Sequence, residues 1–166
     1  MISQLFEWKK VRVVLEYAVY IMLAMILQSL LFSRFSVFGV KGFILPAAAV
    51  AVGMYRGGVR GTVFGLFLGL FADMAFSETT ILFTLLFPIL GFAFGFAADF
   101  YINKSFFAFM VFTVFALLVT ALMQLLSASI ISGAPFFRGI ITAVGQTLVS
   151  IIPSALLYLP FRNSNR

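Results

Sequence analysis

The sequence predicts an all-α integral membrane protein, a polytopic bundle of six (or five) transmembrane helices formed by residues 1–166 as a single transmembrane domain. Of the 166 residues, 63% are hydrophobic and only 10% are charged, whereas an average soluble domain has about 25% charged residues. The mean hydropathy is +1.17. The apolar stretches are long and lack the alternation of membrane β-strands, so they indicate helices. This composition excludes a soluble domain, a disordered chain and a disulfide-rich scaffold.

Six apolar stretches are candidate membrane-spanning helices, which need about 20 residues each. They cover residues 11–32, 43–55, 59–76, 80–98, 106–131 and 137–160. We expect the first to be an uncleaved helix, because its apolar run is too long for a signal peptide. The second is about 20 Å long as a helix. It therefore begins earlier, or is tilted, broken or re-entrant, and its Pro46 suits a first helical turn.

The basic residues predict the orientation of the chain. With six spans, both termini lie on the same side of the membrane. If that side is the cytoplasm, eight Lys and Arg residues lie inside, and only Arg34, Lys41 and Arg138 lie outside. Cytoplasmic loops carry an excess of basic residues, so both termini are expected in the cytoplasm. Because the basic residues lie at the ends of apolar runs, the net charge of +6 indicates orientation, and no nucleic-acid partner is expected.

The residue types also limit the chemistry that the chain can perform. It has no cysteine and no histidine, and only five Asp and Glu residues. Thiol nucleophiles, thiolate metal sites and the commonest proton shuttle are therefore excluded. No nucleotide-binding, zinc-protease or serine-hydrolase motif is present. We expect no enzyme activity, no catalytic or metal-binding residue and no cofactor.

The third apolar stretch contains a row of glycines at four-residue spacing. Gly57, Gly61, Gly65 and Gly69 form the row, and Asp73 occupies its next position. Four residues advance a helix by slightly more than one turn, so the row drifts only about 40° per step. Small residues let helices approach closely in lipid. The row therefore predicts an interface with another helix, either within the chain or in a partner.

The fourth apolar stretch repeats this pattern 26 residues later, with Gly91, Gly95 and Asp99. Rows of small residues are common in membrane helices, so the repeat is either coincidental or a weak internal duplication of the kind seen in transporter folds. The two helices run in opposite directions. Asp73 is therefore expected near the outer face of the membrane and Asp99 near the inner face, in contact with solvent.

Several other polar residues lie within the apolar stretches. Asp73 either bonds nearby backbone or reaches the headgroup layer, or it pairs with an outer basic residue or a partner protein. Glu16 lies four residues after Arg12, so these two side chains can pair on one helix face. Gln124 and Gln146 belong to polar rows on the fifth and sixth helices. Such rows either hydrogen-bond across helices or line a polar cavity.

The order of these features resembles the MreD family of rod shape-determining proteins over nearly the whole chain. Gln28 and Ser29 end the first helix, and Phe38-Gly39 follows in the outer loop. The segment 61–73 is glycine-rich and ends in Asp73, and Pro153-Ser154-Ala155-Leu156 lies near the basic C-terminal end. Two features depart from the family pattern. Pro46 comes seven residues after Gly39, and residues 77–80 lack the usual glycine.

This resemblance implies a non-enzymatic protein of the bacterial cytoplasmic (inner) membrane that acts in cell elongation. It would bind the bitopic protein MreC. Through MreC it would help to couple MreB filaments to peptidoglycan synthesis by a SEDS glycosyltransferase and its penicillin-binding protein. The implied fold is distantly akin to that of the S-components of energy-coupling factor vitamin transporters.

Two other classes remain open at this point. A substrate-binding S-component would need a convergent polar pocket, for which Gln124, Gln146, Ser150 and Asp73 are candidates. It would also need a docking row of small residues on its first helix, where Ala18 and Ala24 are six residues apart and form no such row. An intramembrane enzyme or flippase would need paired carboxylates or a buried base. The two embedded acids, Glu16 and Asp73, are expected near opposite faces of the membrane.

Overall fold

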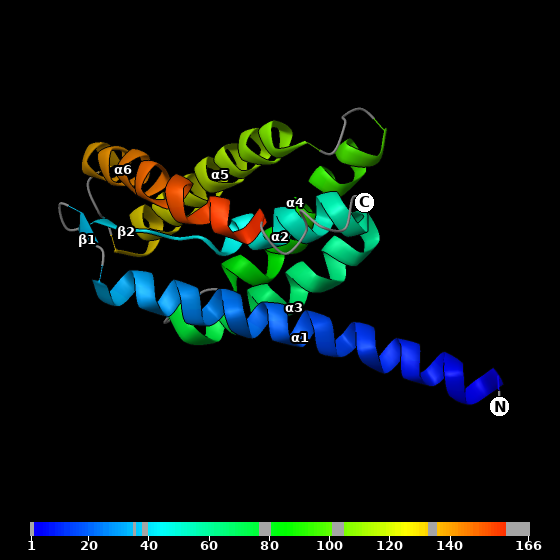
Figure 1. The fold of residues 1–166 in the computed structure, drawn as a ribbon. Coiled ribbons are helices and arrows are strands. Elements are labelled where there is room, and N and C mark those ends of the chain that lie inside the picture. The colour runs from blue at the N-terminus through cyan, green and yellow to red at the C-terminus, as the bar shows by residue number, and fades with distance from the viewer. Residues whose placement is uncertain are drawn as a thin grey trace.

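The computed structural model describes residues 2–34, 36–37, 40–76, 81–100, 105–132 and 136–158. Within them the chain forms a bundle of α-helices (Figure 1), which confirms the predicted all-α class. The helices are α1 (Ile2–Arg34), α2 (Leu45–Arg56), α3 (Gly58–Phe76), α4 (Leu82–Phe100), α5 (Phe106–Ser132) and α6 (Phe136–Ser154), followed by the 3₁₀ turn η1 (Ala155–Tyr158). The strands β1 (Ser36–Val37) and β2 (Val40–Lys41) form a short antiparallel pair between α1 and α2.

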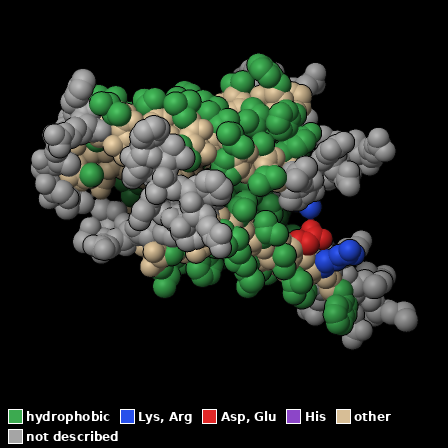
Figure 2. All heavy atoms as spheres, turned by 60° about the vertical axis from the view of Figure 1, so that its left-hand side comes forward, with side chains coloured by type: hydrophobic (Ala, Val, Ile, Leu, Met, Phe, Trp, Pro, Cys, Tyr) green, Lys and Arg blue, Asp and Glu red, His purple; other side chains and the backbone are tan. Residues whose placement is uncertain are grey.

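Among the described helices, five are long and apolar enough to cross a membrane. These segments are Val11–Leu30, Gly58–Ala75, Leu82–Phe100, Phe106–Ile130 and Gly139–Tyr158. Large apolar side chains are exposed along all of them. Figure 2 shows this apolar surface, with a group of acidic and basic side chains near one end. So much exposed apolar surface would be unfavourable in water. The chain is therefore a multi-pass membrane protein whose exterior contacts lipid.

The short second helix lies at the centre of the bundle. α2 has 12 residues, or about 18 Å, too short to span the bilayer core alone. Its residues from Leu45 to Met54 are all buried, and it packs against α3, α4 and α5 (Figure 1). A helix that is apolar on every side is suited to such a position. Pro46 lies in its first turn, where the missing N–H removes no helical hydrogen bond.

Gly57 has a different role from the one that the glycine row predicts. It lies between α2 and α3 with φ +95°, a conformation that residues with a Cβ rarely adopt. Its N–H donates to the carbonyl of Gly53 at 2.9 Å. Gly57 therefore ends α2 and lets the chain reverse into α3, whereas Gly61, Gly65 and Gly69 are the members of the row inside α3.

The last predicted span changes its geometry before its end. The sequence predicts one helix over residues 137–160, but α6 ends at Ser154 and the chain continues as η1 to Tyr158. Pro153 lies inside α6 and has no N–H to donate to the carbonyl one turn earlier. The tighter 3₁₀ geometry, which is common at helix ends, begins at Ala155, two residues after this proline.

Candidate functional site

The segment that leads into α2 is held by side chains from two other helices. Gln28 of α1 is completely buried. Its Nε2 donates to the carbonyl of Gly42 at 2.9 Å, and its Oε1 accepts from the N–H of Ile44 at 2.7 Å. Ser150 of α6 accepts from the N–H of Phe43 at 2.8 Å through its Oγ. Non-helical backbone within a membrane must have its polar groups satisfied inside the protein, and these two side chains do so for the carbonyl of Gly42 and the N–H groups of Phe43 and Ile44.

The polar residues of α5 and α6 also contact each other. Nε2 of Gln146 donates to Oε1 of Gln124 at 3.1 Å, which joins the two helices. Oγ of Ser150 donates to the carbonyl of Gln146 at 2.6 Å. Of the two interpretations left open by the sequence, the structure shows the interhelical hydrogen bond. Together with the Ser150 contact to Phe43, it connects α5, α6 and the entry to α2.

Asp73 binds the beginning of the next helix. Its Oδ1 accepts from the N–H of Phe83 at 3.0 Å, and its Oδ2 accepts from both the N–H and the hydroxyl of Thr84 at 2.7 Å. Phe83 and Thr84 lie in the first turn of α4, where backbone N–H groups lack helical partners. A carboxylate there is stabilised by the hydrogen bonds and by the helix dipole. Asp73 therefore caps α4 from the end of α3.

We expect Asp73→Ala to lower the free energy of unfolding by about 2 kcal/mol, because three hydrogen bonds to one carboxylate are lost. Asp99→Ala is the comparison at the equivalent position of α4, and we expect a smaller loss there because water can replace an exposed carboxylate. Asp99 also ends a G-x-x-x-G-x-x-x-D pattern, but it is exposed. Circular dichroism during a titration with sodium dodecyl sulfate would measure both variants. An Asp73→Ala variant as stable as the parent protein would contradict the capping role of Asp73.

The glycine rows bring α3 and α4 into backbone contact. A Cβ on Gly61 would lie 2.5 Å from the Cα of Gly53 in α2, and one on Gly65 would lie 2.5 Å from the carbonyl oxygen of Phe87 in α4. A Cβ on Gly69 would meet the carbonyl of Phe83. Real Cβ atoms do not approach backbone so closely. The helix that packs against the row is thus α4, and α2 contacts the row at its Gly61 end.

The glycines of α4 complete the same interface. A Cβ on Gly91 would meet the carbonyl of Gly61, and one on Gly95 would lie 2.5 Å from the Cα of Gly58. The two related halves end alike. Asp73 caps the beginning of α4, while Oδ2 of Asp99 lies 3.6 Å from the position of a Cβ on Gly57, beside the beginning of α3. The antiparallel pair therefore has approximate twofold symmetry, the arrangement that an internal duplication would produce.

Glu16 lies between two arginines. Its Oε1 is 3.7 Å from Nε of Arg12, the partner expected from the sequence, and its Oε2 is 3.4 Å from Nη2 of Arg56 at the end of α2. All three side chains are at least one-third exposed, so these ion pairs contribute less than about 1 kcal/mol each. The Glu16–Arg56 pair connects α1 to the end of α2.

Sequence reasoning missed two members of the tight interface, Gly53 and Gly58. Gly53 lies four residues before Gly57, so it continues the row in the sequence, but its contact with Gly61 depends on how α2 folds back on α3. The signal that could have identified Gly53 is this same four-residue spacing, followed back from Gly57 into the second apolar stretch. The predicted pairing of Asp73 with Arg34, Lys41 or Arg138 depends on basic side chains that lie outside the described part of the structure. Phe38-Gly39 and residues 77–80 also lie outside it.

The described residues contain no group of three or more Asp and Glu side chains that could hold a metal ion. Their buried polar groups mostly contact backbone or one another, so the arrangement is one that holds helices together. No family model, curated protein or solved structure matches the chain. The proposal below therefore rests on the sequence resemblance and on the roles of the residues that carry it.

Proposed function

We propose that this chain is a non-enzymatic scaffold of the bacterial cell-elongation machinery, of the MreD type, in the cytoplasmic membrane. Both termini would lie in the cytoplasm. The protein would bind MreC, and through it help to couple MreB filaments to a SEDS glycosyltransferase and its penicillin-binding protein. Its contribution would be a membrane surface for partner helices, with no reaction of its own.

One observation carries the proposal. Gln28 and Asp73, two residues on which the resemblance depends, both occupy places where the fold needs a polar side chain. Gln28 binds the backbone that enters α2, and Asp73 caps α4. A resemblance located in such residues concerns the architecture itself, so it supports a shared fold more strongly than a likeness in apolar composition would.

The polar contacts also favour a scaffold over a vitamin-binding S-component. The four candidates for a polar pocket are all engaged within the protein. Gln124 and Gln146 bond each other, Ser150 binds the backbone of Phe43, and Asp73 binds α4. A solute would have to break these contacts before it could use the same groups.

Purification of the tagged protein from its native membrane in a mild detergent would test the proposal. We expect mass spectrometry to identify MreC and cell-wall synthesis proteins in the purified sample. An unrelated multi-pass protein with the same tag, prepared in parallel, controls for nonspecific recovery. Recovery of paired ATPases and a transmembrane coupling subunit would instead overturn the scaffold role in favour of a transporter.

A further inference from the structure

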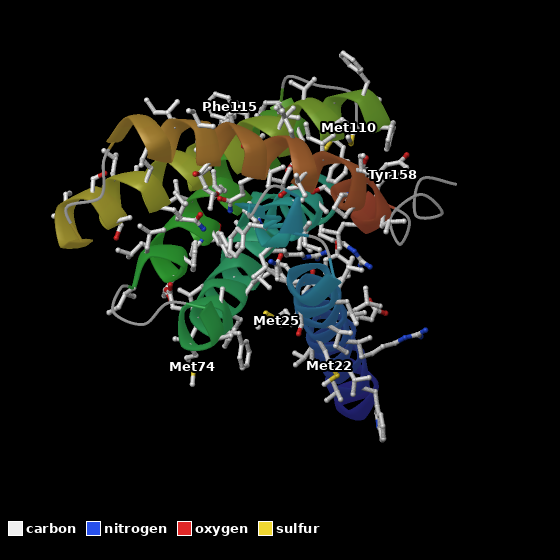
Figure 3. The ribbon with its side chains drawn as sticks, turned by 90° about the vertical axis from the view of Figure 1, so that its left-hand side faces the viewer. Met22, Met25, Met74, Met110, Phe115 and Tyr158 are labelled. Carbon is white, nitrogen blue, oxygen red and sulfur yellow. The ribbon has the colours of Figure 1, made fainter. Side chains whose placement is uncertain are left out.

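An open apolar groove of about 560 Å³ separates α1 from α3. Its walls are residues 14–25 of α1 and 63–71 of α3, and they include Tyr17, Ala18, Met25, Phe67 and Phe71. Figure 3 shows Met25 between the two helices. We propose that this groove binds an acyl chain of an anionic phospholipid, whose phosphate contacts the guanidinium of Arg60. The proposal does not depend on the function proposed above.

The groove is a defined feature of the fold. Its floor is formed where α1 meets the core, through Phe64 of α3. The ring of Phe64 lies 6.0 Å from that of Tyr17 and 5.5 Å from that of Tyr20 between centroids. The volume falls within the range of ordinary ligand pockets, and the polar contribution to its lining is negligible. It therefore suits a hydrocarbon ligand.

The shape of the lining favours a flexible chain over a transmembrane helix of another protein. Helices associate in lipid where small residues let their backbones approach. Here the walls carry bulky Tyr, Phe, Met, Ile and Val side chains, with Ala18 as the small residue among them. The glycines of α3 already face α4 and α2. An acyl chain can follow such an uneven surface, and methionine side chains adapt to it.

A cation lies at one end of the groove. Arg60 precedes Phe64, Phe67 and Phe71 by four, seven and eleven residues, so it lies on the same face of α3 as these groove residues. It is exposed, and it belongs to neither of the ion pairs found among the described residues. Arg12 and Arg56, in contrast, share Glu16. Arginine binds phosphate through parallel N–H donors, which gives the groove a polar terminus that matches a phospholipid.

Photolabelling of the full-length protein would locate the lipid without any mutation. Nanodiscs would contain phosphatidylglycerol with a diazirine in its acyl chain, or phosphatidylcholine with the same chain. We expect the phosphatidylglycerol probe to label peptides from both α1 and α3 at residues 14–25 and 63–71, above its labelling of α4, α5 and α6. Labelling spread evenly over all exposed helices would overturn the proposal.

Two variants would then separate the acyl chain from the headgroup. Ala18→Trp fills the groove and should remove the enriched labelling by both probes, whereas Ala93→Trp, on an exposed position of α4, should not. Arg60→Gln should reduce the preference for phosphatidylglycerol over phosphatidylcholine about fivefold, the effect of one basic residue near a membrane surface. Arg12→Gln should leave this preference unchanged.

Native mass spectrometry of the same variants would show whether a protein occupies the groove instead. If Ala18→Trp displaced a co-purifying protein and left the bound phosphatidylglycerol unchanged, the occupant would be a helix, and the lipid proposal would be wrong. Variants that elute as one monodisperse species and keep the helical circular dichroism of the parent are suitable for this comparison. The proposal is supported if Ala18→Trp loses bound lipid while no co-purifying protein is displaced.

Discussion

Gly65→Ala is expected to destabilise the protein by about 3 kcal/mol, near the upper end of the usual cost of overpacking. The added methyl group would lie 2.5 Å from the carbonyl oxygen of Phe87. Backbone cannot rotate away as a side chain can, so α3 and α4 must separate. This separation also weakens the adjacent contacts of Gly61 and Gly69. Titration with sodium dodecyl sulfate in mixed micelles, followed by far-ultraviolet circular dichroism, would measure the loss.

Gly42→Ala provides a matched control for this substitution. A Cβ on Gly42 would lie 3.4 Å from Cγ1 of Val149 and 3.5 Å from Oγ of Ser150, which are ordinary contact distances. Both glycines are buried, and both variants add the same methyl group. We expect Gly42→Ala to change the stability by less than about 1 kcal/mol. A similar loss in both variants would show that the α3–α4 backbone contact has no special importance.

The sequence predicts the fold class, and that another helix packs closely against α3, for one physical reason. Lipid-exposed helices must be long and apolar, and close helix contacts need small residues, so both leave periodic patterns. The Gly61, Gly65 and Gly69 row is such a pattern. The role of Asp73 can also be predicted in part. The end of α3 and the beginning of α4 are close in the sequence, and a bond to nearby backbone is one of the alternatives that the sequence indicates.

The contacts of Gln28 and Ser150 could not be predicted in the same way. Ser150 meets Phe43 across 107 residues of sequence, and no periodic pattern links two segments that are so far apart. The sequence shows that the second apolar stretch is short, but not that residues 42–44 need hydrogen-bond partners from α1 and α6. The role of Gly57 could not be predicted either, because its spacing fits the row while its positive φ places it in a turn.

Gln28→Leu is expected to destabilise the protein by about 3 kcal/mol, comparable to Gly65→Ala. Leucine has nearly the size of glutamine, so packing is largely preserved while both hydrogen bonds are lost. The carbonyl of Gly42 and the N–H of Ile44 would then be buried without partners, at about 1–3 kcal/mol each. Water cannot easily replace Gln28, which is completely buried. The same detergent titration would measure the effect.

Gln146→Leu separates the loss of a hydrogen bond from the loss of support for the backbone. Gln146 also loses a side-chain hydrogen bond, to Gln124, but both of these side chains are only partly buried, and no backbone group loses its partner. A net hydrogen bond contributes about 1 kcal/mol, so this variant should be much less affected than Gln28→Leu. Equal stabilities of the two variants would mean that the entry to α2 does not need Gln28. The larger loss for Gln28→Leu would identify this residue as the side chain that lets non-helical backbone exist inside the bundle, because Gln28→Leu leaves two main-chain groups without partners and Gln146→Leu leaves none.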